Sequence, residues 1–156
     1  MDTVVGVISD THGLMRPEAL AALHGVDVIL HAGDVGALSV LRDLEGLAPV
    51  HAVCGNIDGQ AFGLPAQLSL SFGGVSFHVS HGHELGTPTP EALAQRYRAD
   101  VVIYGHTHKP LTRQIGSTLV VNPGAAGPRR FSLQPSVALV SIDQSKPSVR
   151  LVTLRT

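Results

Sequence analysis

Three stretches, TVVGVIS (3–9), PEALAAL (17–23) and VDVILH (26–31), decide the fold of this chain. The first and third are short apolar runs rich in β-branched residues, which is typical of buried strands, and the second reads as a helix with proline in its first turn. The same pattern then repeats, because a helix is predicted over 37–44 and a strand over 50–53. Strands that alternate with helices favour a parallel sheet flanked by helices.

The pattern changes in the second half of the chain. Residues 67–72 and 75–80 flank Gly73-Gly74, which predicts a hairpin, and a helix capped by Thr89 is expected over 90–98. The remaining predicted strands follow at short intervals, mainly antiparallel, with Pro147 in the last turn: 101–104, 111–115, 119–121, 137–142 and 149–154. We therefore expect a mixed α/β fold of two packed sheets with helices outside, formed as one domain over residues 1–156.

Composition narrows the class of protein. The chain has 156 residues, a formal net charge of -1, eleven lysines plus arginines and one cysteine. Without excess basic charge, nucleic acid is an improbable partner and a membrane surface is not expected. The first residues lack the pattern of a signal peptide, and the apolar runs are too short to span a bilayer. The composition thus predicts a cytoplasmic protein.

Polar side chains follow five of the predicted strands, directly where each strand ends. They are Asp10, His12, Asp34, Asn56, His81, His106 and His108. Because the carboxyl ends of parallel strands form the ligand crevice of such sheets, these side chains are expected to share one cleft. Glycines beside several of them permit the sharp turns that this requires.

The chemistry of this set indicates two metal ions. Two carboxylates, one amide and four imidazoles are too many ligands for one tetrahedral zinc. A mixed oxygen and nitrogen set suits Mn, Fe, Co, Ni or Zn, and one of the two aspartates is expected to bridge the ions. Two ions about 4 Å apart can clamp a displacement at phosphorus.

The order of these motifs resembles that of the calcineurin-like metallophosphoesterases. The matching segments are Asp10-Thr11-His12, Gly33-Asp34, Gly55-Asn56-Ile57-Asp58, His81-Gly82-His83 and Gly105-His106-Thr107-His108. The loop Asn122-Pro123-Gly124 is similar to that of the small bacterial and archaeal phosphodiesterases. The resemblance covers nearly the whole chain and implies a four-layer α/β/β/α sandwich with two divalent transition-metal ions, Mn²⁺ being favoured.

The resemblance also implies how the ligands are shared between the ions: Asp10, His12 and His108 at the first, Asn56, His81 and His106 at the second, and Asp34 between them. A hydroxide activated by both ions would attack phosphorus, so the expected activity is hydrolysis of small phosphodiesters. A phosphomonoesterase of the same fold and a catalytically silent metal-binding scaffold are the alternatives. A homo-oligomer is possible only by analogy.

The general acid is left open by the sequence. Many members of the larger family carry a histidine after the asparagine, where this chain has Ile57. The catalytic candidates are Asn56, Asp58 and His83, although Asp58 and His83 could instead organise turns. Arg129 is a candidate for binding substrate phosphate, or else an ordinary surface arginine.

His31 has two readings, because it ends a buried strand just before Gly33-Asp34. It could support the metal ligands or be a satisfied core histidine.

Overall fold

The computed structural model describes residues 2–130 and 132–155, so residues 1, 131 and 156 of the predicted domain lie outside the described part. Its first sheet has the strand order β10-β9-β1-β2-β3. The strands are β1 (Thr3–Ile8), β2 (Val28–His31), β3 (Val50–Ala52), β9 (Ser136–Asp143) and β10 (Lys146–Thr153). β1, β2 and β3 are parallel, as predicted, and β9 runs antiparallel to β1.

The second sheet has the order β4-β5-β6-β8-β7. Its strands are β4 (Gln67–Phe72), β5 (Val75–Ser80), β6 (Val101–Ile103), β7 (Leu111–Ile115) and β8 (Thr118–Asn122). The predicted hairpin joins β4 to β5, and a second hairpin joins β7 to β8. β6 pairs in parallel with both of its neighbours, so the centre of this sheet is less antiparallel than the sequence suggested.

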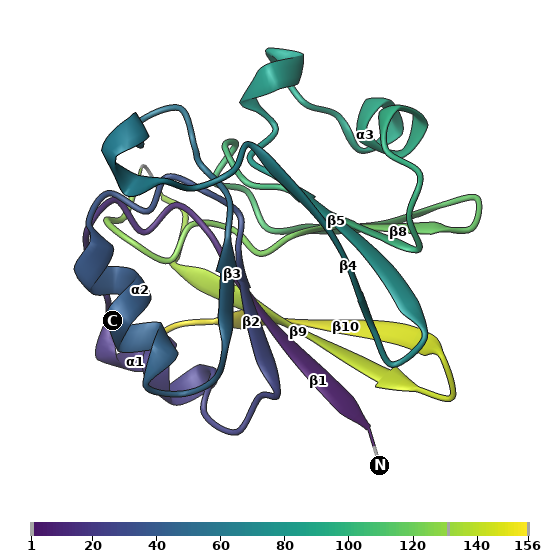
Figure 1. Cartoon of the computed structure of the whole chain (residues 1–156), viewed down its shortest axis with the longest axis horizontal. Helices are drawn as coiled ribbons and strands as arrows, with labels where there is room; N and C mark the ends of the chain where they lie inside the picture. Colours follow the sequence, from purple (N-terminus) through teal and green to yellow (C-terminus); the bar gives the residue numbers. More distant parts are fainter. Residues whose placement is uncertain (1, 131, 156) are drawn as a thin grey trace.

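Helices cover the outer faces of both sheets (Figure 1). The helices are α1 (Pro17–Ala22), α2 (Leu38–Glu45) and α3 (Pro90–Arg96), with short 3-10 turns η1 (Gln60–Phe62) and η2 (His83–Leu85). Apolar side chains fill three interfaces: under α1 and α2, between the sheets, and under α3. The predicted four-layer α/β/β/α arrangement is confirmed. Within the described residues, no helix is long and apolar enough to cross a membrane.

Among the boundaries that differ from prediction, those of β10 and α3 are set by tertiary structure. β10 begins at Lys146, so Pro147 lies in a strand rather than in the turn. An edge strand tolerates proline because one row of its N–H groups needs no partner. The turn itself is Gln144-Ser145, both with positive φ (50° and 61°). α3 ends at Arg96, two residues early.

Candidate metal centre

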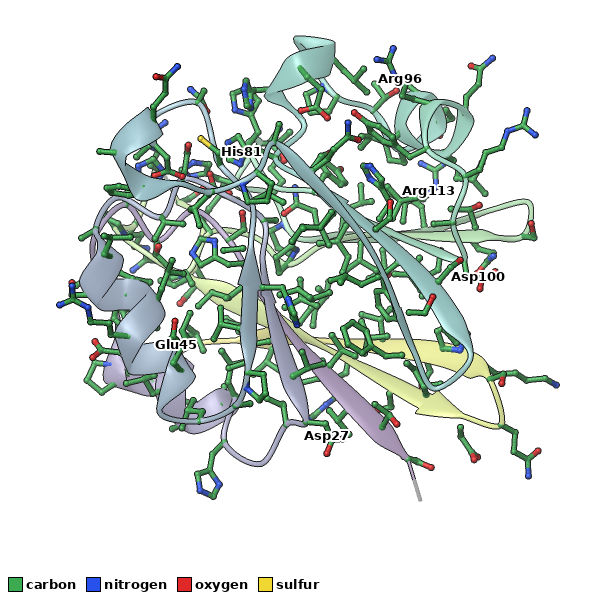
Figure 2. The ribbon with its side chains drawn as sticks, in the orientation of Figure 1. Asp27, Glu45, His81, Arg96, Asp100 and Arg113 are labelled. Atoms are coloured by element: carbon green, nitrogen blue, oxygen red, sulfur yellow. The ribbon has the colours of Figure 1, made fainter. Side chains whose placement is uncertain are left out.

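The loops that follow β1, β2, β5 and β6 meet at one end of the two sheets. Figure 2 shows His81 at this end, directly after β5, whereas Asp27 and Asp100 lie at the opposite end. Because β1 and β2 are parallel, and β5 and β6 are parallel, their carboxyl ends deliver the loops to a common place. The predicted ligands from the two sheets are thus brought to the same end of the molecule.

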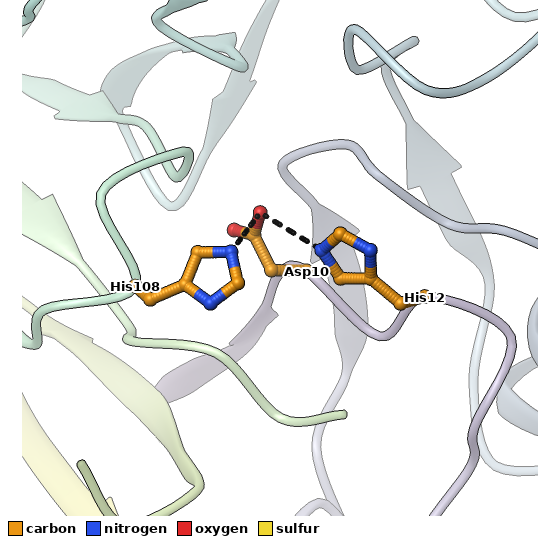
Figure 3. A group of neighbouring side chains, drawn as sticks. All are labelled: Asp10, His12 and His108. Atoms are coloured by element: carbon orange, nitrogen blue, oxygen red, sulfur yellow. Dashed lines mark ion pairs between the residues drawn. The ribbon is translucent and has the colours of Figure 1, made fainter. Parts of the chain in front are cut away.

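Asp10, His12 and His108 form one potential metal site (Figure 3). Asp10 Oδ1 lies 3.3 Å from His108 Nε2 and 3.7 Å from His12 Nε2. Asp10 and His12 come from the first sheet and His108 from the second, so the group spans the gap between sheets.

Asp10, Asp34 and His81 form a second potential site beside the first. Asp34 Oδ2 lies 3.3 Å from His81 Nε2 and 3.6 Å from His12 Nε2, while Asp10 Oδ1 lies 3.8 Å from His81 Nε2. Asp34 Oδ2 therefore stands between a histidine of each group, as a bridging ligand would. Asp10 reaches both groups as well, so bridging by Asp34 stays a prediction.

The remaining two predicted ligands lie at the edge of these groups. The His106 ring is centred 5.2 Å from the His81 ring and meets it edge-on. Asn56 is exposed in the loop between β3 and η1. Their service as ligands stays a prediction, whereas the other five side chains are brought together by the fold.

Buried oxygen and nitrogen atoms without hydrogen-bond partners indicate that this centre fits a cation. Asp10 Oδ1, His12 Nε2 and His81 Nε2 are buried and have no hydrogen-bond partner within the described part of the chain. Buried polar atoms are normally paired, so this group needs an explanation. Ligand atoms about 2.1 Å from a shared metal lie roughly 3–3.5 Å apart, close to the separations found here.

The titration of the centre reflects mutual attraction between its acids and imidazoles. Burial alone would raise the pKa of Asp10, but His108, His12 and His81 outweigh it and hold that pKa far below its usual range. Burial lowers the pKa of His81, yet Asp34 and Asp10 raise it above the ordinary value. A metal cation bound beside these carboxylates would therefore compete with a proton on His81.

Strained backbone is concentrated at the predicted ligands. Positive φ values occur at Asp10 (53°), His12 (48°), Asp34 (54°), His106 (71°) and His108 (64°). In the described residues, the only other non-glycine examples are the two turn residues between β9 and β10. Such conformations cost on the order of 1–3 kcal/mol each and gather at functional sites.

Two glycines allow the loops to approach one another. A Cβ at Gly55 would collide with the backbone N and Oδ1 of Asp34, and one at Gly105 would collide with Ser9 Oγ and lie 2.6 Å from Asp10 Oδ2. Neither position has room for a side chain, because Asp34 fills the space at Gly55, and Ser9 together with Asp10 fills it at Gly105.

Hydrogen bonds orient two of the candidate ligand side chains. Asp10 Oδ2 accepts from Ser9 Oγ (2.6 Å) and from the His106 N–H (3.1 Å), which leaves Oδ1 facing the centre. His81 Nδ1 donates to the Ala32 carbonyl (2.8 Å). The neutral His81 ring therefore presents an unprotonated Nε2, the form that binds metal.

Asp58 organises loops instead of facing the centre. Its two carboxylate oxygens accept from the N–H groups of Val35 (3.0 Å), Gly36 (3.0 Å) and Gly55 (2.9 Å). These bonds tie the loop after β2 to the loop after β3. With both oxygens occupied by backbone donors, the geometry favours the turn-organising reading over the general acid.

His83 and Arg129 lie at the rim. The exposed His83 ring is centred 5.3 Å from the His81 ring and lines a hollow of about 180 Å³ together with Tyr97 and Arg96. Arg129 lines a small cavity beside His108. The roles of both residues stay predictions.

Sequence reasoning missed the role of Asn122. Its side chain donates to the Gly105 carbonyl (3.1 Å) and to Thr107 Oγ1 (3.1 Å), and it accepts from the Gly124 N–H (2.9 Å). It thereby fixes the loop that carries His106 and His108. The sequence signal that could have revealed this role is the position of Asn122, a polar residue at the end of a buried strand.

Comparisons with known proteins agree with this geometry. The profile of the calcineurin-like phosphoesterase superfamily domain matches residues 4–145. A probable metallophosphoesterase of Methanothermobacter thermautotrophicus is 38% identical over 159 residues, covering 96% of this chain and 91% of the relative. A phosphodiesterase of Escherichia coli is 43% identical over 148 residues, covering 75% and 76%. Zinc-bound Vps29 of Entamoeba histolytica matches with a TM-score of 0.84 at 29% identity, covering 97% and 92%.

Proposed function

Because the chain belongs to the calcineurin-like phosphoesterase superfamily, we propose that it hydrolyses small phosphodiesters at a centre of two divalent metal ions. Family membership confirms the resemblance in its motifs and the expectation of a phosphoric ester hydrolase, since relatives include named phosphodiesterases. The observation that carries the proposal is the set of buried, unpaired donor atoms on Asp10, His12 and His81.

Seven side chains would hold the ions: Asp10, His12 and His108 at one, Asn56, His81 and His106 at the other, and Asp34 at both. Bound there, the ions would polarise the ester and lower the pKa of a water molecule, which supplies the nucleophile at neutral pH. The ligands are already oriented for this task. The Ile57 N–H fixes Asp34 Oδ1 (3.1 Å) and so leaves Oδ2 directed at His81.

Two residues at the rim complete the proposed site. Arg129 would bind a phosphate oxygen as a cation near His108. His83 would protonate the leaving group, because it stands beside His81 and His106 and is exposed enough to exchange a proton with water.

The substrate is proposed to be small. The net charge of -1 and eleven lysines plus arginines offer no basic track for a polynucleotide. Manganese as the metal, the cytoplasm as the location and a homo-oligomeric state stay predictions.

The test is hydrolysis of bis-p-nitrophenyl phosphate beside p-nitrophenyl phosphate, after chelation and separate addition of Mn²⁺, Ni²⁺, Co²⁺, Zn²⁺ or Mg²⁺. We expect metal-restored cleavage of the diester, greatest with Mn²⁺. Faster cleavage of the monoester would replace the phosphodiesterase by a phosphomonoesterase.

A metal-binding scaffold is the second candidate function, because the similar Vps29 structure is a complex with Zn²⁺. Two bound ions without turnover of either ester would support it. Turnover that depends on added metal would exclude it.

A further inference from the structure

His31, the last residue of β2, is fully buried between two loops that carry expected metal ligands. Its Nε2 lies 3.0 Å from Thr11 Oγ1, and its Nδ1 accepts from the Gly33 N–H at 3.1 Å. Thr11 lies in the loop after β1 and Gly33 in the loop after β2, each directly next to an aspartate of the centre. One imidazole thus joins both loops.

The hydrogen-bond partners define the protonation of this ring. Thr11 Oγ1 donates its single hydrogen to the Val35 carbonyl (2.8 Å), so it can only accept from His31 Nε2–H. The Gly33 N–H requires an unprotonated Nδ1 on the other side. His31 is therefore a neutral, Nε2-protonated imidazole with both nitrogens paired, and it adds no positive charge beside a site for cations.

We infer that His31 is a positioning residue that sets the metal affinity of the centre. By holding Thr11 and Gly33, it fixes how the carboxylates of Asp10 and Asp34 stand relative to each other. The inference rests on the metal centre of the proposed function. It extends beyond the ligands, because His31 touches none of their side chains in the described hydrogen bonds.

The alternative is that His31 only fills space at the end of β2. Backbone hydrogen bonds also join the two loops, from the Asp10 N–H to the Gly33 carbonyl (3.0 Å) and from the His12 N–H to the Asp34 carbonyl (2.9 Å). These bonds hold the main chain, and they would survive a side-chain substitution. A filler could be replaced by an apolar residue of similar size without a change in metal affinity.

The test is calorimetric titration of Mn²⁺ into the chelator-treated, full-length protein and its variants. We expect His31→Leu to weaken Mn²⁺ binding by about 10- to 100-fold, the usual effect of losing a support behind metal ligands. His31→Gln keeps an amide N–H near the Nε2 position, so it should recover affinity to within about 5-fold of wild type. His51→Leu on neighbouring β3 is the matched control and should bind Mn²⁺ like wild type.

A folded His31→Leu protein, judged by circular dichroism, that binds Mn²⁺ within twofold of wild type would overturn the inference. If His31→Leu does not fold, Thr11→Val decides, since it leaves the imidazole in place and removes the hydroxyl that accepts from His31 and donates to the Val35 carbonyl. A 10-fold loss in Thr11→Val supports positioning, and unchanged affinity overturns it. These titrations contain no substrate, so a wild-type protein that binds two ions but hydrolyses nothing would refute the proposed function and leave this inference standing.

Discussion

Asp34 shows how surroundings prepare one residue for a metal. Burial by itself would raise the pKa of its carboxyl, but His81 and the Ile57 N–H hold that pKa below the usual value. The residue also adopts a φ of 54°, and its Oδ2 lies between His81 and His12. The charge and the direction of the Asp34 carboxylate therefore both depend on neighbouring residues. If this charge is removed, we expect no other residue to replace it.

We expect Asp34→Asn to lower kcat/KM for bis-p-nitrophenyl phosphate by at least about 100-fold, because a neutral amide is a poor ligand between two cations. The fold should persist, since the amide can keep the shape of the carboxylate. Steady-state kinetics with added Mn²⁺ and circular dichroism check both parts. Asp43→Asn on the exposed face of α2 is the control, and wild-type turnover in Asp34→Asn would refute the mechanism.

His31 also makes stability depend on pH. Burial lowers its pKa from 6.5 to about 4, although Asp10 and Asp58 act in the opposite direction. Between these values the unfolded chain binds the proton and the folded chain does not, so stability must fall as the pH falls. The loss should approach about 3 kcal/mol by pH 4.

Urea unfolding of the chelator-treated protein from pH 7 to pH 4 measures this slope. His31→Gln should flatten it, while His24→Gln, at an exposed histidine, should not. If the free energy of unfolding falls equally with pH in His31→Gln and in wild type, groups other than His31 cause the loss of stability in acid.

At the scale of elements, the site is a set of strand-end loops, and at some points these loops approach so closely that only glycine fits. Gly55 illustrates this packing, because any Cβ there would displace Asp34. Gly59, four residues later in the same loop, has open space around the equivalent position and a φ of -80°. The two glycines lie in the same loop, but only Gly55 is packed against Asp34, so Gly59 serves as its control.

Gly55→Ala should therefore weaken Mn²⁺ binding and activity by about 10- to 100-fold, whereas Gly59→Ala should change both by less than about twofold. Calorimetry and the diester assay measure the two effects. Wild-type Mn²⁺ affinity in Gly55→Ala would mean that the loop relaxes at no cost to Asp34.

The sequence predicted the strands and helices well where the spacing of apolar residues determines them. Apolar β-branched runs marked β1, β2 and β6, and the Gly73-Gly74 turn marked the hairpin of β4 and β5. The candidate ligands could be found because each follows a predicted strand. Boundaries set by tertiary contacts were missed. α3 ends before Tyr97, because the Tyr97 ring stacks on the His78 ring with 3.7 Å between centroids and its hydroxyl donates to Glu84 Oε2 at 2.6 Å. The role of Asp58 depends on backbone donors from other loops, which no local pattern reveals.

At the scale of the whole molecule, the centre joins the two sheets. Asp10, His12 and Asp34 follow strands of the first sheet, and His81 and His108 follow strands of the second. Apart from the core between the sheets, bound ions would be a further link between them. A ligand that binds only the folded state stabilises it by mass action.

Mn²⁺ at about 100 times its Kd should thus add about 2.7 kcal/mol per site and raise Tm by roughly 5–10 °C. Differential scanning calorimetry with Mn²⁺ and with chelator measures the shift. Asp34→Asn should show a much smaller one. An unchanged Tm at saturating Mn²⁺ would mean that the ions do not bind at the metal centre between the two sheets.

The position of β1 has a consequence for biosynthesis. β1 pairs with β2 on one side and with β9 on the other, where Val5 lies opposite Val140. A ribosome makes β1 early and β9 late, so the backbone N–H and C=O groups on one edge of β1 stay unpaired through most of translation. Open edges invite pairing with other chains, and contacts between residues so far apart form slowly. We therefore expect the nascent chain to be most prone to pairing with other chains before β9 emerges from the ribosome.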